Sequence, residues 1–104
     1  MNNYEIIVLR AAKIDLEEII DWYESQKIGL GLNFFREVQE VFSRLTINPL
    51  VYQENFLFVR KAVLFKYPYS IFYAVNEVDL EIEILAILHQ RINPVELQKR
   101  INFL

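Results

Sequence analysis

The fold is decided by residues 60–94, which read RKAVLFKYPYSIFYAVNEVDLEIEILAILHQRINP. Aromatic and β-branched residues fill this stretch, and turn residues interrupt it at Tyr67-Pro68 and at residues 76–79. Such a composition with short breaks is typical of strands joined by hairpin connections. We therefore predict three strands over residues 58–66, 69–75 and 81–89, running as an antiparallel meander.

The first half of the chain changes its apolar period from two residues to 3.6. Residues 4–9 read YEIIVL, which predicts a first strand largely buried on both faces. Apolar residues then recur at helical spacing from Ala12 towards Gly29, and again from Phe34 until Asn48-Pro49. Two helices joined by a few residues form an antiparallel hairpin.

These elements predict an α+β fold with two layers and the order βααβββ. A helical hairpin covers one face of a four-stranded, mainly antiparallel sheet, because the amphipathic helices and the sheet must each bury an apolar face. Residues 50–55 are expected to form a loop, and Pro94 begins at most a short C-terminal helix. With 104 residues and no linker, the chain is expected to be one domain, residues 1–104.

Composition excludes several classes of function. The chain has no cysteine and one histidine, which rules out thiolate zinc sites and histidine-rich metal centres within one chain, so we predict no metal and no cofactor. The net charge of -3 gives no global positive field for nucleic acid. No apolar run reaches the ~18 residues of a membrane span, and the N-terminus lacks the pattern of a signal peptide, so a cytoplasmic protein is expected.

The single histidine, His89, ends the last predicted strand beside Gln90 and Arg91. In a regular strand the even residues 82–88 share an apolar face, so His89 would point away from the helix-covered core. The sequence leaves open which face carries Arg60. If that face is the open one, an exposed surface would combine Arg60, His89 and Arg91 with Tyr69 or Tyr73.

Each of these residues also has a purely structural interpretation. His89 could cap a backbone carbonyl at the end of its strand. Arg60, Lys61 and Lys66 could form the solvated face of an edge strand, where positive charge discourages aggregation. The aromatic residues around Tyr69 could serve sheet packing, and Trp22 could be a core or hairpin contact.

Taken together, the motifs resemble the RelE/ParE superfamily of toxins from bacterial type II toxin-antitoxin systems, over nearly the whole chain. The resemblance rests on the element order and on several segments in sequence order. These segments are DLEEI with DWY (residues 15–19 and 21–23), FF (34–35), NP (48–49), VRK (59–61), FKYPYSIFY (65–73) and ILAILHQR followed by NP (84–91 and 93–94).

The resemblance leaves two targets open, because RelE-like members cleave mRNA on the ribosome and ParE-like members inhibit DNA gyrase. A metal-independent ribonuclease would use His89 as acid or base, Arg60 to stabilise the transition state and Arg91 to hold a phosphate. Three differences from RelE-like members weaken the ribonuclease interpretation. Gln90 stands where RelE-like members often have a tyrosine, residues 50–55 contain no lysine, and the pI is about 5.1.

The His-Gln-Arg ending at residues 89–91 is closer to ParE-like members, so gyrase inhibition is the favoured hypothesis. The resemblance then implies target contacts through Lys61, Lys66, Tyr69 and Gln90. It also implies a cognate antitoxin, whose contacts are expected at Trp22, Tyr23, Phe34 and Phe35. Without its antitoxin, the chain is expected to expose an apolar patch and to self-associate. The sequence leaves undecided whether the protein forms a homo-oligomer or a hetero-oligomer with the antitoxin.

Overall fold

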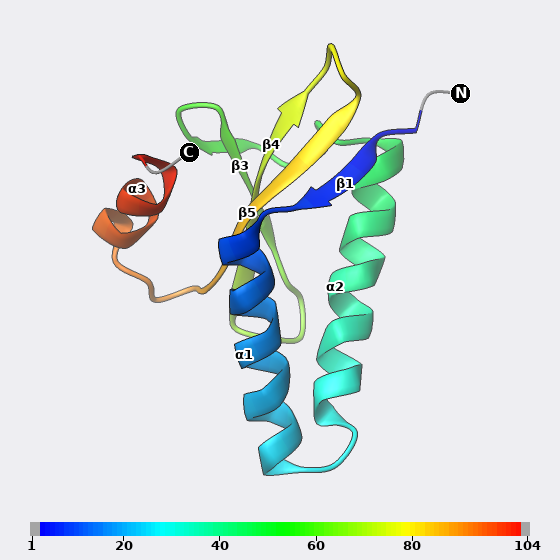
Figure 1. Cartoon of the computed structure of the whole chain (residues 1–104), viewed down its shortest axis with the longest axis vertical. Coiled ribbons are helices and arrows are strands. Elements are labelled where there is room, and N and C mark those ends of the chain that lie inside the picture. The colour runs from blue at the N-terminus through cyan, green and yellow to red at the C-terminus, as the bar shows by residue number, and fades with distance from the viewer. Residues whose placement is uncertain (1–2, 103–104) are drawn as a thin grey trace.

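The computed structural model describes residues 3–102 (Figure 1). Its elements, in chain order, are β1 (Glu5–Val8), α1 (Arg10–Gln26), α2 (Leu30–Ile47), β2 (Glu54–Phe56), β3 (Val59–Val63), β4 (Tyr69–Asn76), β5 (Glu81–His89) and α3 (Pro94–Asn102). The predicted α+β class and the helical hairpin on a sheet are confirmed. Within the described residues the sheet has five strands rather than four, because the segment expected to be a loop contributes the three-residue strand β2.

The strands lie in the order β1-β5-β4-β3-β2, which makes β5 an interior strand. Strands β3 to β5 form the predicted antiparallel meander. The additional strand β2 pairs antiparallel with β3, and β1 pairs with β5 in parallel. The first strand was expected to be buried on both faces, and this was wrong. β1 is an edge strand in which Glu5 is exposed and the next three residues are only half-buried.

The first core lies between the helical hairpin and one face of the sheet, here called the hairpin face. Helices α1 and α2 run side by side in opposite directions beneath the strands (Figure 1). Their apolar stripes predict this burial, because Leu16, Phe34 and Val38 follow the helical period. The buried members of this core are Ala12, Leu16, Ile19, Phe34, Val38, Val41, Leu45, Ala62, Leu64, Ile71, Tyr73, Ile82, Ile84 and Ile87.

The connection between α1 and α2 is fixed by one carboxylate and two glycines. Glu24 accepts hydrogen bonds from the backbone N–H groups of Gly29 and Gly31, at 2.9 and 3.0 Å, and so satisfies two of the donors at the α2 N-terminus. Gly29 has a φ of 96°, which favours glycine. A Cβ on Gly31 would lie 2.7 Å from the carbonyl oxygen of Ile20, so the two helices approach closely here.

A β-bulge interrupts the pairing of β4 with β5. Phe72 pairs with Ala86 while Tyr73 pairs with Ile84, so Leu85 is an extra residue on β5. One extra residue exchanges the two faces of a strand from that point onward. The expected shared face of residues 82, 84, 86 and 88 is therefore wrong: Ile82 and Ile84 belong to the first core, whereas residues 86 and 88 do not.

The second core covers the opposite face of the sheet, here called the α3 face. It consists of Val59, Phe72, Ala74, Leu85, Ala86, Leu88, Leu97 and Ile101. Leu97 and Ile101 are one helical turn apart on α3 and are both buried, which holds the short helix against the sheet. The predicted short C-terminal helix after Pro94 is thus present, and Figure 1 shows it across the sheet from α2.

Candidate functional site

A hollow of about 240 Å³ lies where β5 ends and α3 begins. It brings together three residues selected from the sequence, which are Lys61, His89 and Gln90. The rest of its lining consists of Asn55, Phe72, Ile92, Pro94 and Leu97. Amide, ammonium and imidazole groups over an apolar floor can bind a polar side chain or an anion, so this hollow is the candidate functional site.

Lys61 supplies the cation of this site. It pairs with Phe72 across β3 and β4, and its Nζ lies 5.9 Å from the centroid of the Phe72 ring. A half-exposed ammonium over an aromatic face is held in place by a cation–π interaction. The positive charge is therefore positioned on the α3 face.

His89 lies at the rim of the site and on the hairpin face. It pairs with Tyr69, and the two rings meet edge to face with centroids 5.3 Å apart. Tyr69 itself packs against the first core. The expectation that His89 points away from the helix-covered core was therefore wrong, because the bulge at Leu85 reverses the last part of the strand.

The imidazole of His89 makes a hydrogen bond to the local backbone. Its Nδ1 accepts the backbone N–H of Arg91 at 3.1 Å, so the neutral ring carries its proton on Nε2. The structural alternative of a strand-end cap is thus observed, with an N–H group in place of the expected carbonyl. While this bond holds, neutral His89 presents a donor rather than a base.

Arg60 is on the other face of the sheet from Lys61. It pairs with Tyr73 on the hairpin face, and its Nη1 donates to the carbonyl oxygen of Tyr52 at 2.6 Å. His89 pairs with Tyr69, four residues earlier on β4. Arg60 and His89 are therefore separated by about 13 Å along the strands and by two strand spacings of about 4.8 Å. The structure does not bring these two residues together.

The remaining target candidates are dispersed. Arg91 and Lys66 are exposed, and Lys66 lines a separate hollow beside Glu37 and Glu40 of α2. Tyr69 is half-buried between His89 and the hairpin. Of the residues expected to contact a target, only Lys61 and Gln90 share one hollow.

Tyr73 is not available as a surface group. It is completely buried, and its hydroxyl donates to the carbonyl oxygen of Pro49 at 2.7 Å. Burial raises the pKa of this hydroxyl to about 12, although the nearby Arg60 charge acts in the opposite direction.

Of the four residues expected to contact an antitoxin, Trp22, Tyr23 and Phe34 form one aromatic cluster, and the exposures of all four differ. Trp22 is 56% exposed, Tyr23 and Phe35 are half-buried, and Phe34 is completely buried. Phe34 stacks on Tyr23 with centroids 5.5 Å apart, so it supports the cluster from inside and cannot be part of a contact surface. Burial, with smaller effects of Tyr69 and Tyr67, raises the pKa of the Tyr23 hydroxyl.

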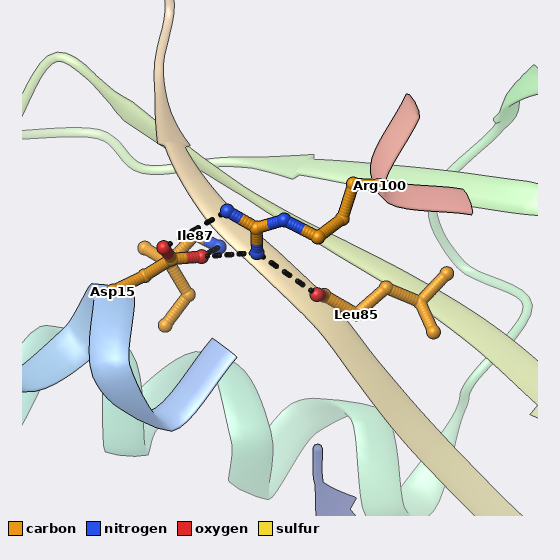
Figure 2. A network of polar contacts seen from close by, with 4 residues as sticks. All are labelled: Asp15, Leu85, Ile87 and Arg100. Carbon is orange, nitrogen blue, oxygen red and sulfur yellow. Dashed lines mark hydrogen bonds and ion pairs between the residues drawn. The ribbon is translucent and has the colours of Figure 1, made fainter. Parts of the chain in front are cut away.

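A polar network behind the site could not be found from the sequence. Asp15 of α1 accepts two hydrogen bonds from the Arg100 guanidinium, at 2.8 and 3.1 Å, and one from the backbone N–H of Ile87 at 3.0 Å. Arg100 also donates to the carbonyl oxygen of Leu85 at 3.5 Å. Figure 2 shows Arg100 reaching across β5 to Asp15, so the pair ties α1, the bulged strand and α3 together.

Within residues 3–102, no group of three or more histidine, cysteine, aspartate or glutamate side chains is arranged to hold a metal ion. None of the helices described is long and apolar enough to cross a membrane.

Comparison with known proteins identifies relatives of this fold. A family model described as "ParE toxin of type II toxin-antitoxin system, parDE" matches residues 6–94. A solved chain of the chromosomal ParDE system from P. aeruginosa has a TM-score of 0.72 and 24% identity, covering 86% of this chain and 98% of that one. For a chain of the toxin-antitoxin complex RelBE2 from Mycobacterium tuberculosis the TM-score is 0.59 and the identity 16%, covering 84% and 98%. No curated protein matches the sequence.

Proposed function

The chain belongs to the ParE toxin family of type II toxin-antitoxin systems, and from that premise we propose that it arrests growth by binding and inhibiting DNA gyrase. We further propose that a cognate antitoxin neutralises it and that it acts in the cytoplasm. The observation that carries the choice of gyrase is the separation of Arg60 from His89 by β4 and by four residues along the strands.

Metal-independent RNA cleavage requires a base, an acid and a cation around one phosphate. Arg60 is on the hairpin face and donates to Tyr52, while His89 uses its only free lone pair to accept from Arg91. An inhibitor that binds a protein needs no such convergence. The arrangement therefore supports a binding function better than a catalytic one.

The target contact would centre on the hollow beside α3. Lys61 offers a charge held over Phe72, and Gln90 is an exposed amide that can both donate and accept hydrogen bonds. His89 adds an Nε2 donor at the rim. Such a set fits polar side chains of a protein partner. Lys66 and Tyr69 would contribute only if the partner also extends over the β3–β4 turn.

The antitoxin would bind along the helical hairpin. Trp22 is exposed and its ring contacts the half-buried Tyr23, while Phe35 on α2 is also half-buried. Leu32 is 49% exposed and Ile28 90%, which extends the apolar surface around the turn between the helices. Apolar side chains exposed together in this way mark interaction sites. The isolated toxin is accordingly expected to self-associate, and the antitoxin to suppress this.

The test is inhibition of purified gyrase. We expect the chain to block DNA supercoiling, and we expect His89→Ala to keep most of this activity. Lys61→Glu should weaken inhibition at least fivefold, because it reverses the one charge positioned in the hollow. Lys13→Glu, an exposed charge reversal on α1, is the matched control and should have no effect. Undiminished supercoiling in the presence of folded toxin would exclude gyrase as the target.

The second candidate is a RelE-like, ribosome-dependent mRNA endoribonuclease that uses Arg60 and His89, with Arg91 on a phosphate. The position of His89 in the same hollow as Lys61 favours it. Pulse-labelling of protein and DNA synthesis, after the toxin is induced without antitoxin, distinguishes the two candidate functions. Early loss of protein synthesis, abolished by His89→Ala, would support the ribonuclease, whereas early loss of DNA synthesis with an SOS response would support gyrase inhibition.

A further inference from the structure

The far end of the sheet, remote from His89, contains a second and larger hollow of about 620 Å³. It lies where β4 extends beyond the beginning of β3. Its lining consists of Leu50, Glu54, Phe58, Arg60, Ala74, Val75, Asn76, Glu77, Val78 and Glu83. No step of the proposed function uses it.

The backbone of β4 is open at this hollow. The carbonyl of Tyr69 accepts the N–H of Leu64 towards β3, whereas the carbonyl of Pro68 accepts the N–H of Gln90 towards β5. The backbone N–H and C=O groups of successive residues in a strand point alternately to its two neighbours. Those of the odd residues of β4 therefore point towards β3, and Val75 is the last odd residue of β4. The pairing of β3 with β4 ends at Arg60 and Tyr73.

The residue that would pair with Val75 has turned away from the sheet. Phe58 belongs to the turn between β2 and β3, in which Leu57 has a φ of 53°. Within residues 3–102, no backbone hydrogen bond joins this turn to Val75. The N–H and C=O of Val75 are thus free to pair with another chain, as at any unprotected strand edge.

The side chains around this edge indicate what would pair there. Phe58 is 53% exposed and Val78 92%, which gives an apolar rim. The carboxylates of Glu54, Glu77 and Glu83 line the hollow, against the single guanidinium of Arg60, which already donates to Tyr52. The net charge of the lining is negative, so a basic partner is electrostatically complementary.

We propose that this hollow is a docking site for an extended, basic segment of a partner protein, which adds a short strand beside Val75. Main-chain hydrogen bonds to Val75 supply the pairing, and lysine or arginine side chains of the segment meet the three glutamates. Alternate apolar side chains of the segment contact Phe58 and Val78, as in other cases of strand addition.

The experiment uses two octapeptide probes, one alternating lysine with valine and the other alternating glutamate with valine. Amide exchange and backbone NMR shifts of the full chain are followed with each probe. We expect the basic peptide to slow exchange of the Val75 amide at least tenfold and to bind at least fivefold more tightly than the acidic one. Its binding should also weaken with salt.

Glu54→Lys combined with Glu77→Lys should weaken binding of the basic peptide at least fivefold. Both side chains are exposed, so the fold is expected to remain intact. Glu17→Lys combined with Glu18→Lys, which reverses two exposed charges on α1, is the matched control and should leave binding unchanged.

Three outcomes would overturn the proposal. One is the absence of binding by the basic peptide, and another is equal or stronger binding of the acidic peptide. The third is protection of Val75 that rises with protein concentration alone, which would assign this edge to a second copy of the chain. None of these bears on gyrase inhibition, so the proposed function is tested separately.

Discussion

Asp15 and Arg100 are 85 residues apart in the sequence and form a two-pronged ion pair at 2.8 and 3.1 Å. The pair joins the first helix to the last one across β5. Its side chains are only 14% and 27% exposed, so water screens it less than a surface pair. The neighbouring carboxylate raises the pKa of Arg100 further, which keeps the guanidinium charged at all ordinary pH values.

Asp15→Ala is expected to lower the free energy of unfolding by about 2 kcal/mol, because it removes the partner of Arg100 and leaves the Ile87 N–H without an acceptor. Urea denaturation measures the change. Glu17→Ala, two residues away and exposed, is the matched control and should stay within about 0.5 kcal/mol of the wild type. Equal stability of the two variants would show that the pair does not hold α3 in solution.

Tyr73→Phe tests the buried hydroxyl and should cost about 1–2 kcal/mol at neutral pH, because the Pro49 carbonyl loses its donor. The raised pKa also predicts an alkaline effect. Between pH 10 and about 12 the unfolded chain loses the proton of Tyr73 while the folded chain keeps it, so stability falls as pH rises through this window. Below pH 10 this contribution is fully present.

Denaturation of wild type and Tyr73→Phe at pH 9 and at pH 11 measures this alkaline effect. The variant should lose less stability between the two pH values than the wild type does. Parallel losses would mean that Tyr73 titrates no differently in the folded chain, and would contradict the raised pKa.

Gly31→Ala should destabilise the hairpin by about 1–3 kcal/mol, because its methyl group would meet the Ile20 carbonyl oxygen, which is part of a helix backbone and can move little. In an ordinary helix the same change would be favourable by up to about 1 kcal/mol. Asn33→Ala, exposed on the same helix, is the control. Thermal unfolding shows whether Gly31→Ala lowers or raises stability. An increase in its Tm would contradict the close approach of residue 31 to the Ile20 carbonyl oxygen.

Ser70→Ala should leave stability unchanged or raise it by up to about 1 kcal/mol, because within residues 3–102 the buried Ser70 hydroxyl has no hydrogen-bond partner. Ser70→Val adds volume at a completely buried position, so it is expected to lower stability and serves as the comparison variant. If Ser70→Ala destabilised the chain by more than 1 kcal/mol, the hydroxyl would have to be bonded in solution.

Local patterns were sufficient to predict the order of elements. The apolar stripe through Leu16 and Val38 predicted the hairpin, and the break at Tyr67-Pro68 predicted the turn before β4, because both are features of neighbouring residues. β2 was missed because three residues with little apolar content give no period-two signal.

The site was predicted only in part, because its geometry depends on distant pairings. Lys61, His89 and Gln90 were each selected from the sequence for separate reasons, and only the structure shows that they line one hollow. Arg60 was grouped with His89, although the strand register places them on different parts of the sheet. The bulge at Leu85 has no local signature, and the contact of Asp15 with Arg100 exists only after the chain has folded.

The number of residues in β5 decides which of the two faces of the sheet each side chain after Leu85 points to. Removing Leu85 would reverse the face of the sheet to which the side chains of residues 86–89 point, without changing any of those residues. An alignment of related chains that closes a gap at this position would therefore compare residues that face different partners. Single-residue insertions and deletions in β5 can thus exchange the residues that its end presents on the hairpin face and on the α3 face.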